Sequence, residues 1–356
     1  MAYTTIDDPS AYFQTLLYTG DGTSSQAQTN TGNSDLQPDW VWIKKRAGGT
    51  ARAHQLYDST RGVTKLLHSD SDGAEQTQSA GLTAFGSDGF TVSDDDGIGA
   101  NTATYVAWQW KCNGGTSSAS GSESGSNLAY DFQVNTTSKF MINKYTGRGS
   151  SSTLNLGNHF TPEFMIFKNR SQGDDWVVYH HKNTAYPWTD HLHLNTTAAT
   201  SDDEQMFEDV VFAADEINLG TNHEVNADGE NYVAYAFAGV QGYSKFGSYT
   251  GNGNTDGAFV YTGFKPAWVM IKRTNDTQDW VIFDNKLRPA NGVDNGFLSP
   301  NKDDDEDSSD QFDIVSNGFK LRMTSNLANG SGDDYIYMAF AEHPFVSSKG
   351  VPVTAR

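Results

Sequence analysis

Clusters of aspartates beside glycine are the first residues in this sequence whose types and spacing could support chemistry. Asp94, Asp95 and Asp96 precede a glycine, and Asp303 and Asp305 lie in a run of five acidic residues. Calcium takes six to eight oxygen ligands, so these five aspartates are candidate calcium ligands. Their spacing does not match the twelve-residue calcium loop of EF-hands. The alternative is that both clusters are solvated acidic loops.

Histidines form a second candidate group, in the middle of the chain. His180 and His181 are adjacent, and His191 and His193 are separated by one residue. On a strand, residues i and i+2 project to the same face, and zinc can use such a pair when further ligands are present. No third ligand stands at an obvious spacing, so the alternative is ordinary surface or half-buried histidines.

Aromatic residues outside the repeated segments are candidates for ligand binding. Tyr186, Trp188 and Tyr243 lie in segments rich in turn-forming residues. Aromatic faces stack on sugar rings, which would give a lectin-like surface. The alternative is packing in the protein interior.

Several functional classes are not expected from this sequence. It contains no Gly-x-Ser-x-Gly, no Walker loop, no HExxH and no dinucleotide fingerprint, so we predict no catalytic residues, no enzyme activity and no cofactor other than calcium. The formal charge of −20 argues against nucleic-acid binding, and the absence of a long apolar run argues against membrane insertion. A single cysteine excludes an internal disulfide.

The same order of short sequence phrases occurs three times along the chain, which indicates internal repeats. Each repeat begins with Tyr-Thr-Gly-x-Gly, continues about 20 residues later with a proline and an apolar run, and closes with an aromatic run. The copies start at Tyr18, Tyr145 and Tyr249, and their prolines are Pro38, Pro162 and Pro266. The glycines of the opening phrase are expected to serve tight turns, because no helix follows to make a phosphate loop.

Short apolar runs bounded by Gly, Asn, Asp and Ser predict an all-β fold of three tandem β-sandwich or jelly-roll-like repeats, each about 100 residues long. The predicted boundaries are repeat one at 1–112, a flexible Gly/Ser-rich linker at 113–138, repeat two at 139–240, and repeat three with a C-terminal tail at 241–356.

Both faces of the strand after each proline are apolar, so both faces must be covered, by a neighbouring unit, a loop or another subunit. Because only the first interval contains the linker, repeats two and three are expected to pack tightly and repeat one to be set apart. Helical signals are limited to a capped turn after Asp8 and to residues 203–217, which could equally be strand.

Long phrases resemble a family of repeat-containing structural proteins of tailed bacteriophages, especially marine and cyanobacterial phages. The phrases begin at Leu36 (LQPDWVWIK), Tyr105 (YVAWQWK), Tyr243 (YSKFGSYTGNG), Lys265 (KPAWVMIKR) and Tyr337 (YMAFAEHPF). The resemblance implies a virion protein assembled in the host cytoplasm, with other virion proteins as partners. It favours a homo-oligomeric tail appendage or fibre component that contacts the host surface, and the loop aromatics add a host-surface glycan as a candidate partner. A capsid decoration protein and a carbohydrate-binding module remain alternatives, and a polysaccharide-degrading enzyme is a third class.

Overall fold

The computed structural model describes residues 4–287, 291, 296–307 and 312–344, so most of the predicted C-terminal tail lies outside the described residues. The prediction of an all-β sandwich fold is confirmed, because the sheets are antiparallel throughout and the helices are single turns. No helix among the described residues is long and apolar enough to cross a membrane.

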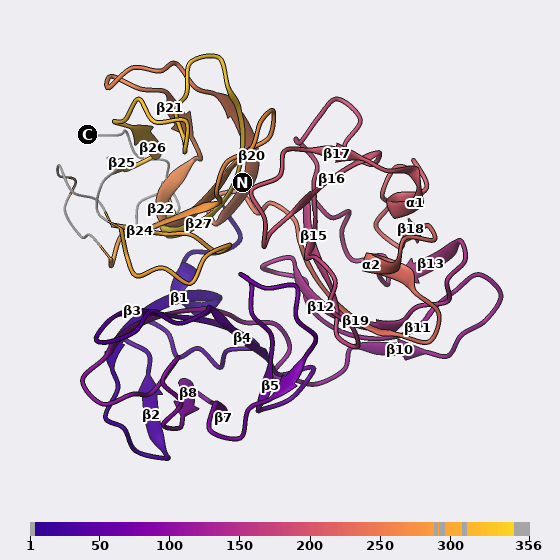
Figure 1. Cartoon of the computed structure of the whole chain (residues 1–356), viewed down its shortest axis with the longest axis horizontal. Coiled ribbons are helices and arrows are strands. Elements are labelled where there is room, and N and C mark those ends of the chain that lie inside the picture. Colours follow the sequence, from indigo (N-terminus) through magenta and orange to yellow (C-terminus); the bar gives the residue numbers. More distant parts are fainter. Residues whose placement is uncertain (1–3, 288–290, 292–295, 308–311, 345–356) are drawn as a thin grey trace.

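The elements fall into three units that Figure 1 shows as three lobes around a common centre. Unit one comprises η1 (Pro9–Ala11), β1 (Phe13–Thr19), β2 (Gln26–Thr29), β3 (Trp40–Ala47), β4 (Gln55–Asp58), β5 (Lys65–Leu66), β6 (Gln76–Thr77), β7 (Leu82–Gly86), β8 (Gly89–Val92) and β9 (Thr104–Trp110). Unit two comprises β10 (Ala119–Gly121), β11 (Ala129–Asn135), β12 (Phe140–Thr146), β13 (Ser152–Asn155), β14 (Phe164–Asn169), β15 (Val177–His180), β16 (Asp190–His193), β17 (Ser201–Asp202), α1 (Glu204–Phe207), β18 (Glu216–Leu219), α2 (His223–Asn226) and β19 (Asn231–Phe237). Unit three comprises β20 (Ser244–Thr250), β21 (Phe259–Tyr261), β22 (Phe264–Arg273), β23 (Val281–Asp284), β24 (Phe297–Leu298), β25 (Phe312–Val315), β26 (Gly318–Leu321) and β27 (Asp334–Pro344).

One strand order occurs in the large sheet of every unit. The closing strand lies between the opening strand and the strand that contains or follows the proline, which gives β1-β9-β3-β4, β12-β19-β14-β15 and β20-β27-β22-β23. A smaller sheet belongs to each unit: β2-β8-β7, β13-β18 and β21-β26-β25. The recurring phrases are therefore the strands of the large sheets.

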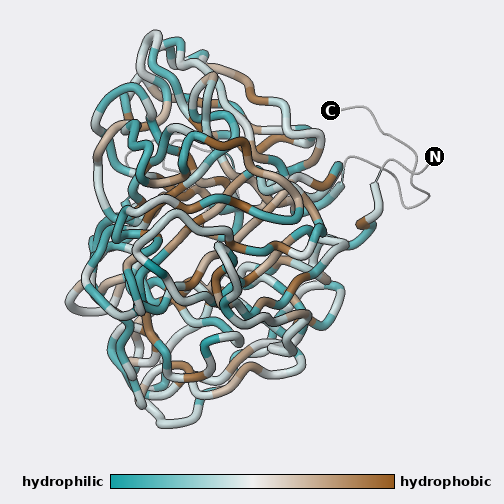
Figure 2. Tube along the Cα trace, turned by 90° about the vertical axis from the view of Figure 1, so that its right-hand side faces the viewer, coloured by the Kyte–Doolittle hydropathy of each residue, from teal (hydrophilic) through white to brown (hydrophobic). Residues whose placement is uncertain are grey.

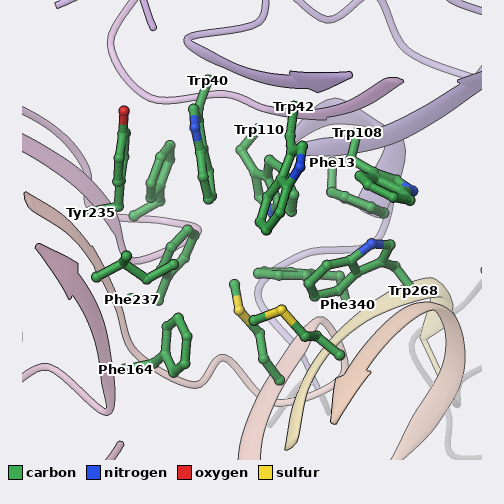
Figure 3. Close-up of a cluster of buried hydrophobic side chains, with 14 of the residues drawn as sticks. Phe13, Trp40, Trp42, Trp108, Trp110, Phe164, Tyr235, Phe237, Trp268 and Phe340 are labelled. Atoms are coloured by element: carbon green, nitrogen blue, oxygen red, sulfur yellow. The ribbon is translucent and has the colours of Figure 1, made fainter. Parts of the chain in front are cut away.

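A central core lies where the three large sheets face one another. It contains aromatic side chains from every unit, as Figure 3 shows for Trp40 and Trp110 of unit one, Phe237 of unit two and Phe340 of unit three. The Trp40 ring stacks on Tyr235 of unit two at 4.4 Å between centroids. The apolar segments accordingly run through the interior of the trace in Figure 2.

The opposite face of each large sheet belongs to a core private to its unit. Along β9, for example, Val106 and Trp108 face the central core, whereas Tyr105 and Ala107 face the core of unit one. This alternation explains the two apolar faces of the repeated strands, because successive strand residues point to opposite sides. Both faces are covered within one chain, so the two-sided pattern alone gives no reason to expect a homo-oligomer.

The segment 113–138 differs from the flexible linker predicted for it. It contains β10 and β11, and β11 pairs with β12 along seven residues. Leu128 and Phe132 are fully buried in the core of unit two. Composition predicted flexibility, but backbone pairing with β12 and these two apolar side chains order the segment. Unit one is also not set apart, because it supplies four tryptophans to the central core.

Local turns follow the expectations from sequence more closely. Asp8 caps η1 by accepting from the Ser10 amide at 3.0 Å. Residues 203–217 contain both α1 and the start of β18. The glycines of Tyr-Thr-Gly-x-Gly make turns: a Cβ on Gly147 would lie 2.3 Å from the Ala227 carbonyl oxygen, and Gly149 has φ of +65°.

Candidate functional site

Buried lysines join the three units into a closed ring. Each large sheet carries a fully buried lysine at the same register of its post-proline strand, and each ammonium reaches a backbone carbonyl of another unit at 2.9–3.2 Å. The donors and acceptors are Lys44 and Asp303, Lys168 and Asp72, and Lys272 and Thr197. Unit one therefore bonds to three, three to two, and two to one. Burial lowers the pKa of each lysine to about 8.

A second set of hydrogen bonds joins the units in the same order. It uses a ring nitrogen of the residue directly before β15, β23 or β4. Trp176 and Trp280 donate their indole N–H groups to carbonyls of the preceding unit, and His54 occupies the equivalent place in unit one. The pairs are Trp176 with His68 at 2.8 Å, Trp280 with His193 at 2.9 Å, and His54 with Ser299 at 3.0 Å. The order of units is the same as for the lysines.

A third set of contacts runs in the opposite direction around the centre. The residue that ends β4, β15 or β23 is bonded to a large-sheet strand of the next unit. The pairs are Asp58 with Tyr235 at 2.7 Å, His180 with the Tyr337 carbonyl at 3.1 Å, and Asp284 with Trp108 at 3.0 Å. Burial lowers the pKa of His180 to about 3, so its ring is neutral. The interior thus contains three sets of polar contacts that join the units.

Two of the three aromatic residues predicted to bind ligands lie in one surface loop. The Tyr186 side chain is 65% exposed, and its ring meets Trp188 edge to face at 5.9 Å. Trp188 is only half-buried and packs on the core of unit two. The third prediction, Tyr243, is wrong: this residue is 1% exposed and belongs to the central core, where Phe340 covers its ring.

A second pair of exposed aromatics was not predicted from the sequence. Phe259 and Tyr261 lie on β21 and are each half exposed, while Val260 between them is buried. The Lys245 ammonium lies 5.3 Å from the Tyr261 ring centre, a cation–π distance. The available signal was aromatic residues alternating with valine in a short strand, which puts both rings on one side.

The aspartates of the first acidic cluster point to different partners. Asp95 accepts from the Gln55 and Gln78 side-chain amides, at 2.6 and 2.9 Å. Asp96 forms ion pairs with Lys45 at 2.7 Å and with Arg52. Asp94 accepts from the hydroxyl of the preceding serine. The three carboxylates do not converge on one point, which a calcium site requires.

The second acidic cluster lines a cleft of about 550 Å³ at the edge of unit three. Asp303 uses its carbonyl to accept from Lys44. Glu306 of the same run forms an ion pair with Arg46 at 2.6 Å. Asp305 lines the cleft but joins no group of three convergent ligands among the described residues. This segment therefore connects units one and three.

One cluster in the described part of the chain places three metal-ligand atoms within 4.8 Å of one another: His191, His193 and Glu224. The two histidines come from β16, and α2 supplies the glutamate. Burial lowers the pKa of His191. Burial also disfavours the charged form of His193, but the bond and charge of Glu224 outweigh it and raise the His193 pKa. The sequence showed the histidine pair and gave no sign of its partner, which lies 31 residues further along.

Comparison with known families gives one match that spans the three units. A family model described as a domain of unknown function, DUF7483, matches residues 8–344. No curated protein matches the chain. The matched segment includes all three large sheets and every hydrogen bond between units described above (the seams between units), together with the surface aromatics and the histidine cluster.

Proposed function

The chain belongs to the DUF7483 family, and we propose that it is a structural protein of a tailed-bacteriophage particle, in a tail appendage that contacts the host surface. The observation that carries the proposal is the resemblance of five long phrases to phage structural proteins. These phrases are strands β3, β9, β20, β22 and β27 or their flanks, so the resemblance concerns the framework of the molecule.

The architecture supports a mechanical role. Three sandwiches close around one core, and the buried lysines and the indoles of Trp176 and Trp280 donate to carbonyls of another unit. Interlocked packing of this kind makes a stiff body, because close-packed interiors deform little. Other virion proteins are the proposed partners. A homo-oligomer would use outer surfaces such as the exposed pair Phe259 and Tyr261.

Immunogold labelling of intact particles tests the location. Gold on the tail supports the appendage, and gold on the shell supports the alternative of a capsid decoration protein. Absence of label from particles, with the antibody shown to bind the purified native chain, contradicts both.

A carbohydrate-binding module is the second candidate function, favoured by the exposed Tyr186 and its contact with Trp188. A glycan array tests it with the unmodified chain, Tyr186→Ala and Trp188→Ala. Val211→Ala is the matched control, because Val211 is 61% exposed and not aromatic. Binding that is lost only in the two aromatic variants supports the module. Binding to no glycan, or equal binding by all four proteins, counts against it.

A further inference from the structure

The histidine cluster of unit two is a set of residues that the scaffold does not require. Strand pairing identifies the matching positions in the other units. Leu192 pairs with Val178 in unit two, Leu298 pairs with Ile282 in unit three, and Leu67 pairs with Leu56 in unit one. The equivalents of His191 and His193 are Leu66 and His68 in unit one, and Phe297 and Ser299 in unit three.

The position of Glu224 is also specific to unit two. The Tyr232 hydroxyl bonds to the His223 carbonyl, as Tyr335 bonds to Asn326 and Tyr105 to Asp96. The residues that follow the three accepting residues therefore occupy equivalent positions, and they are Glu224 in unit two, Leu327 in unit three and Gly97 in unit one. Three positions that converge in space carry metal-binding side chains together only in unit two.

An unpartnered buried nitrogen marks this cluster. His191 is 5% exposed, and its Nδ1 has no hydrogen-bond partner among the described residues. A buried ring nitrogen without a partner loses its hydration without compensation. The His191 ring lies 5.0 Å from the ring of His193, on the same side of β16. A cation bound through Nδ1 would give this nitrogen the partner that it lacks.

The ligand types and spacing fit zinc. We propose that His191, His193 and Glu224 bind one zinc ion in unit two. His193 Nε2 lies 3.1 Å from Glu224 Oε2, close to the roughly 3.3 Å edge of a tetrahedron with zinc bonds of 2.0–2.1 Å. The widest separation is at most 4.8 Å, so the cluster closes by up to about 1.5 Å around the ion.

Neighbouring groups hold the ligands in place. The Asn222 side chain caps α2 by accepting from the Glu224 amide at 2.9 Å, which fixes the start of the single turn. Asp175 Oδ2 lies 4.0 Å from His193 Nδ1, which is beyond hydrogen-bond distance, so its influence on this ring is electrostatic. The His193 carbonyl accepts from Trp280, so the ion would stiffen the seam between units two and three. Three protein ligands leave the fourth zinc position for water.

Zinc titration of the full chain tests the site. The chain is stripped with EDTA, dialysed and titrated with zinc chloride by calorimetry. The variants are Glu224→Gln, which keeps the side-chain shape, and His191→Phe, which introduces the residue of unit three. His223→Gln is the matched control, because His223 adjoins Glu224 but its side chain is 72% exposed and bonds to Asp174.

We expect one zinc ion per chain and a rise in melting temperature with zinc for the unmodified chain and His223→Gln. Affinity should fall at least about tenfold in both ligand variants, since each removes a direct ligand. Melting of each variant in EDTA separates loss of the site from loss of the fold. No stoichiometric binding, or unchanged affinity in folded Glu224→Gln, overturns the proposal.

Discussion

Phe237 offers the sharpest test of whether the three units stabilise one another. Its side chain is 1% exposed in the central core. Its ring centroid lies 6.0 Å from Trp40 of unit one, 4.4 Å from Phe140 of unit two and 5.8 Å from Phe340 of unit three. Phe237→Ala therefore opens a cavity bordered by all three units.

The expected cost follows from the burial of the ring. Replacing a buried phenylalanine by alanine costs about 3–5 kcal/mol, the sum of lost transfer free energy and the cavity left behind. At about 2.1 cal/mol/K of unfolding entropy per residue, a chain of 356 residues should lose about 4–7 °C in melting temperature. Tyr186→Ala is the control, and its exposed ring should change stability by less than about 0.5 kcal/mol.

Hydrogen exchange locates the loss within the molecule. If the units open together, amide protection in β9, β19 and β27 should fall by the same free energy in Phe237→Ala. Calorimetry should still show one transition. A loss of protection confined to the strands of unit two would refute the shared core as a cooperative unit, as would separate transitions for the three units.

Three further predictions follow from buried groups. Burial lowers the pKa of Lys44, Lys168 and Lys272 from 10.5 to about 8, so above pH 8 the unfolded chain binds more protons than the native chain. The free energy of unfolding in urea should therefore rise from pH 8 to 9.5, and a fall would contradict the assignment. Cys112 is 4% exposed, and burial raises the pKa of its thiol well above the usual range, so Ellman's reagent should titrate no thiol in the native chain and one in denaturant. Rapid reaction of the native chain with the reagent would refute the burial of Cys112. Gly147→Ala places a methyl group 2.3 Å from a carbonyl oxygen and should cost about 1–3 kcal/mol by urea unfolding, and an unchanged midpoint would show that the turn adapts.

Strand positions were predictable because local pattern determines them. The apolar runs after Pro38, Pro162 and Pro266 are strands or parts of strands, and alternation indicated that both of their faces are covered. The partner of each face was not predictable, because contacts such as Trp40 with Tyr235 join residues almost 200 positions apart. Composition also failed for 129–135, whose order comes from pairing with β12.

The candidate site residues also show that contacts between distant segments could not be predicted from the sequence. Tyr186 and Tyr243 were both candidates for ligand binding, with interior packing as the alternative. The sequence did not distinguish them, because both follow turn-rich segments and only the fold buries Tyr243. The pair His191 and His193 was visible as a spacing on a strand. Glu224 could not be found, because the fold of unit two, and not any spacing in the sequence, places it beside the two histidines.

The buried lysines carry a sequence signal that the apolar pattern of the strands obscures. Lys44, Lys168 and Lys272 occupy one position, at the end of the apolar run of each post-proline strand, and the next residue is Lys45, Asn169 or Arg273. Each of these lysines is buried and donates to fixed carbonyl acceptors, since an unpaired buried charge is costly. Such a recurrence, in a chain built of repeats, indicates polar seams between the units.

The most direct test of the proposed virion role is the amount of this chain in gradient-purified particles of the phage proposed to encode it. Quantitative mass spectrometry should find the chain in particles at a fixed ratio to the major capsid protein, unchanged by a second gradient at high salt. Recovery only in the soluble fraction of the lysate, with none in infectious particles, would contradict it.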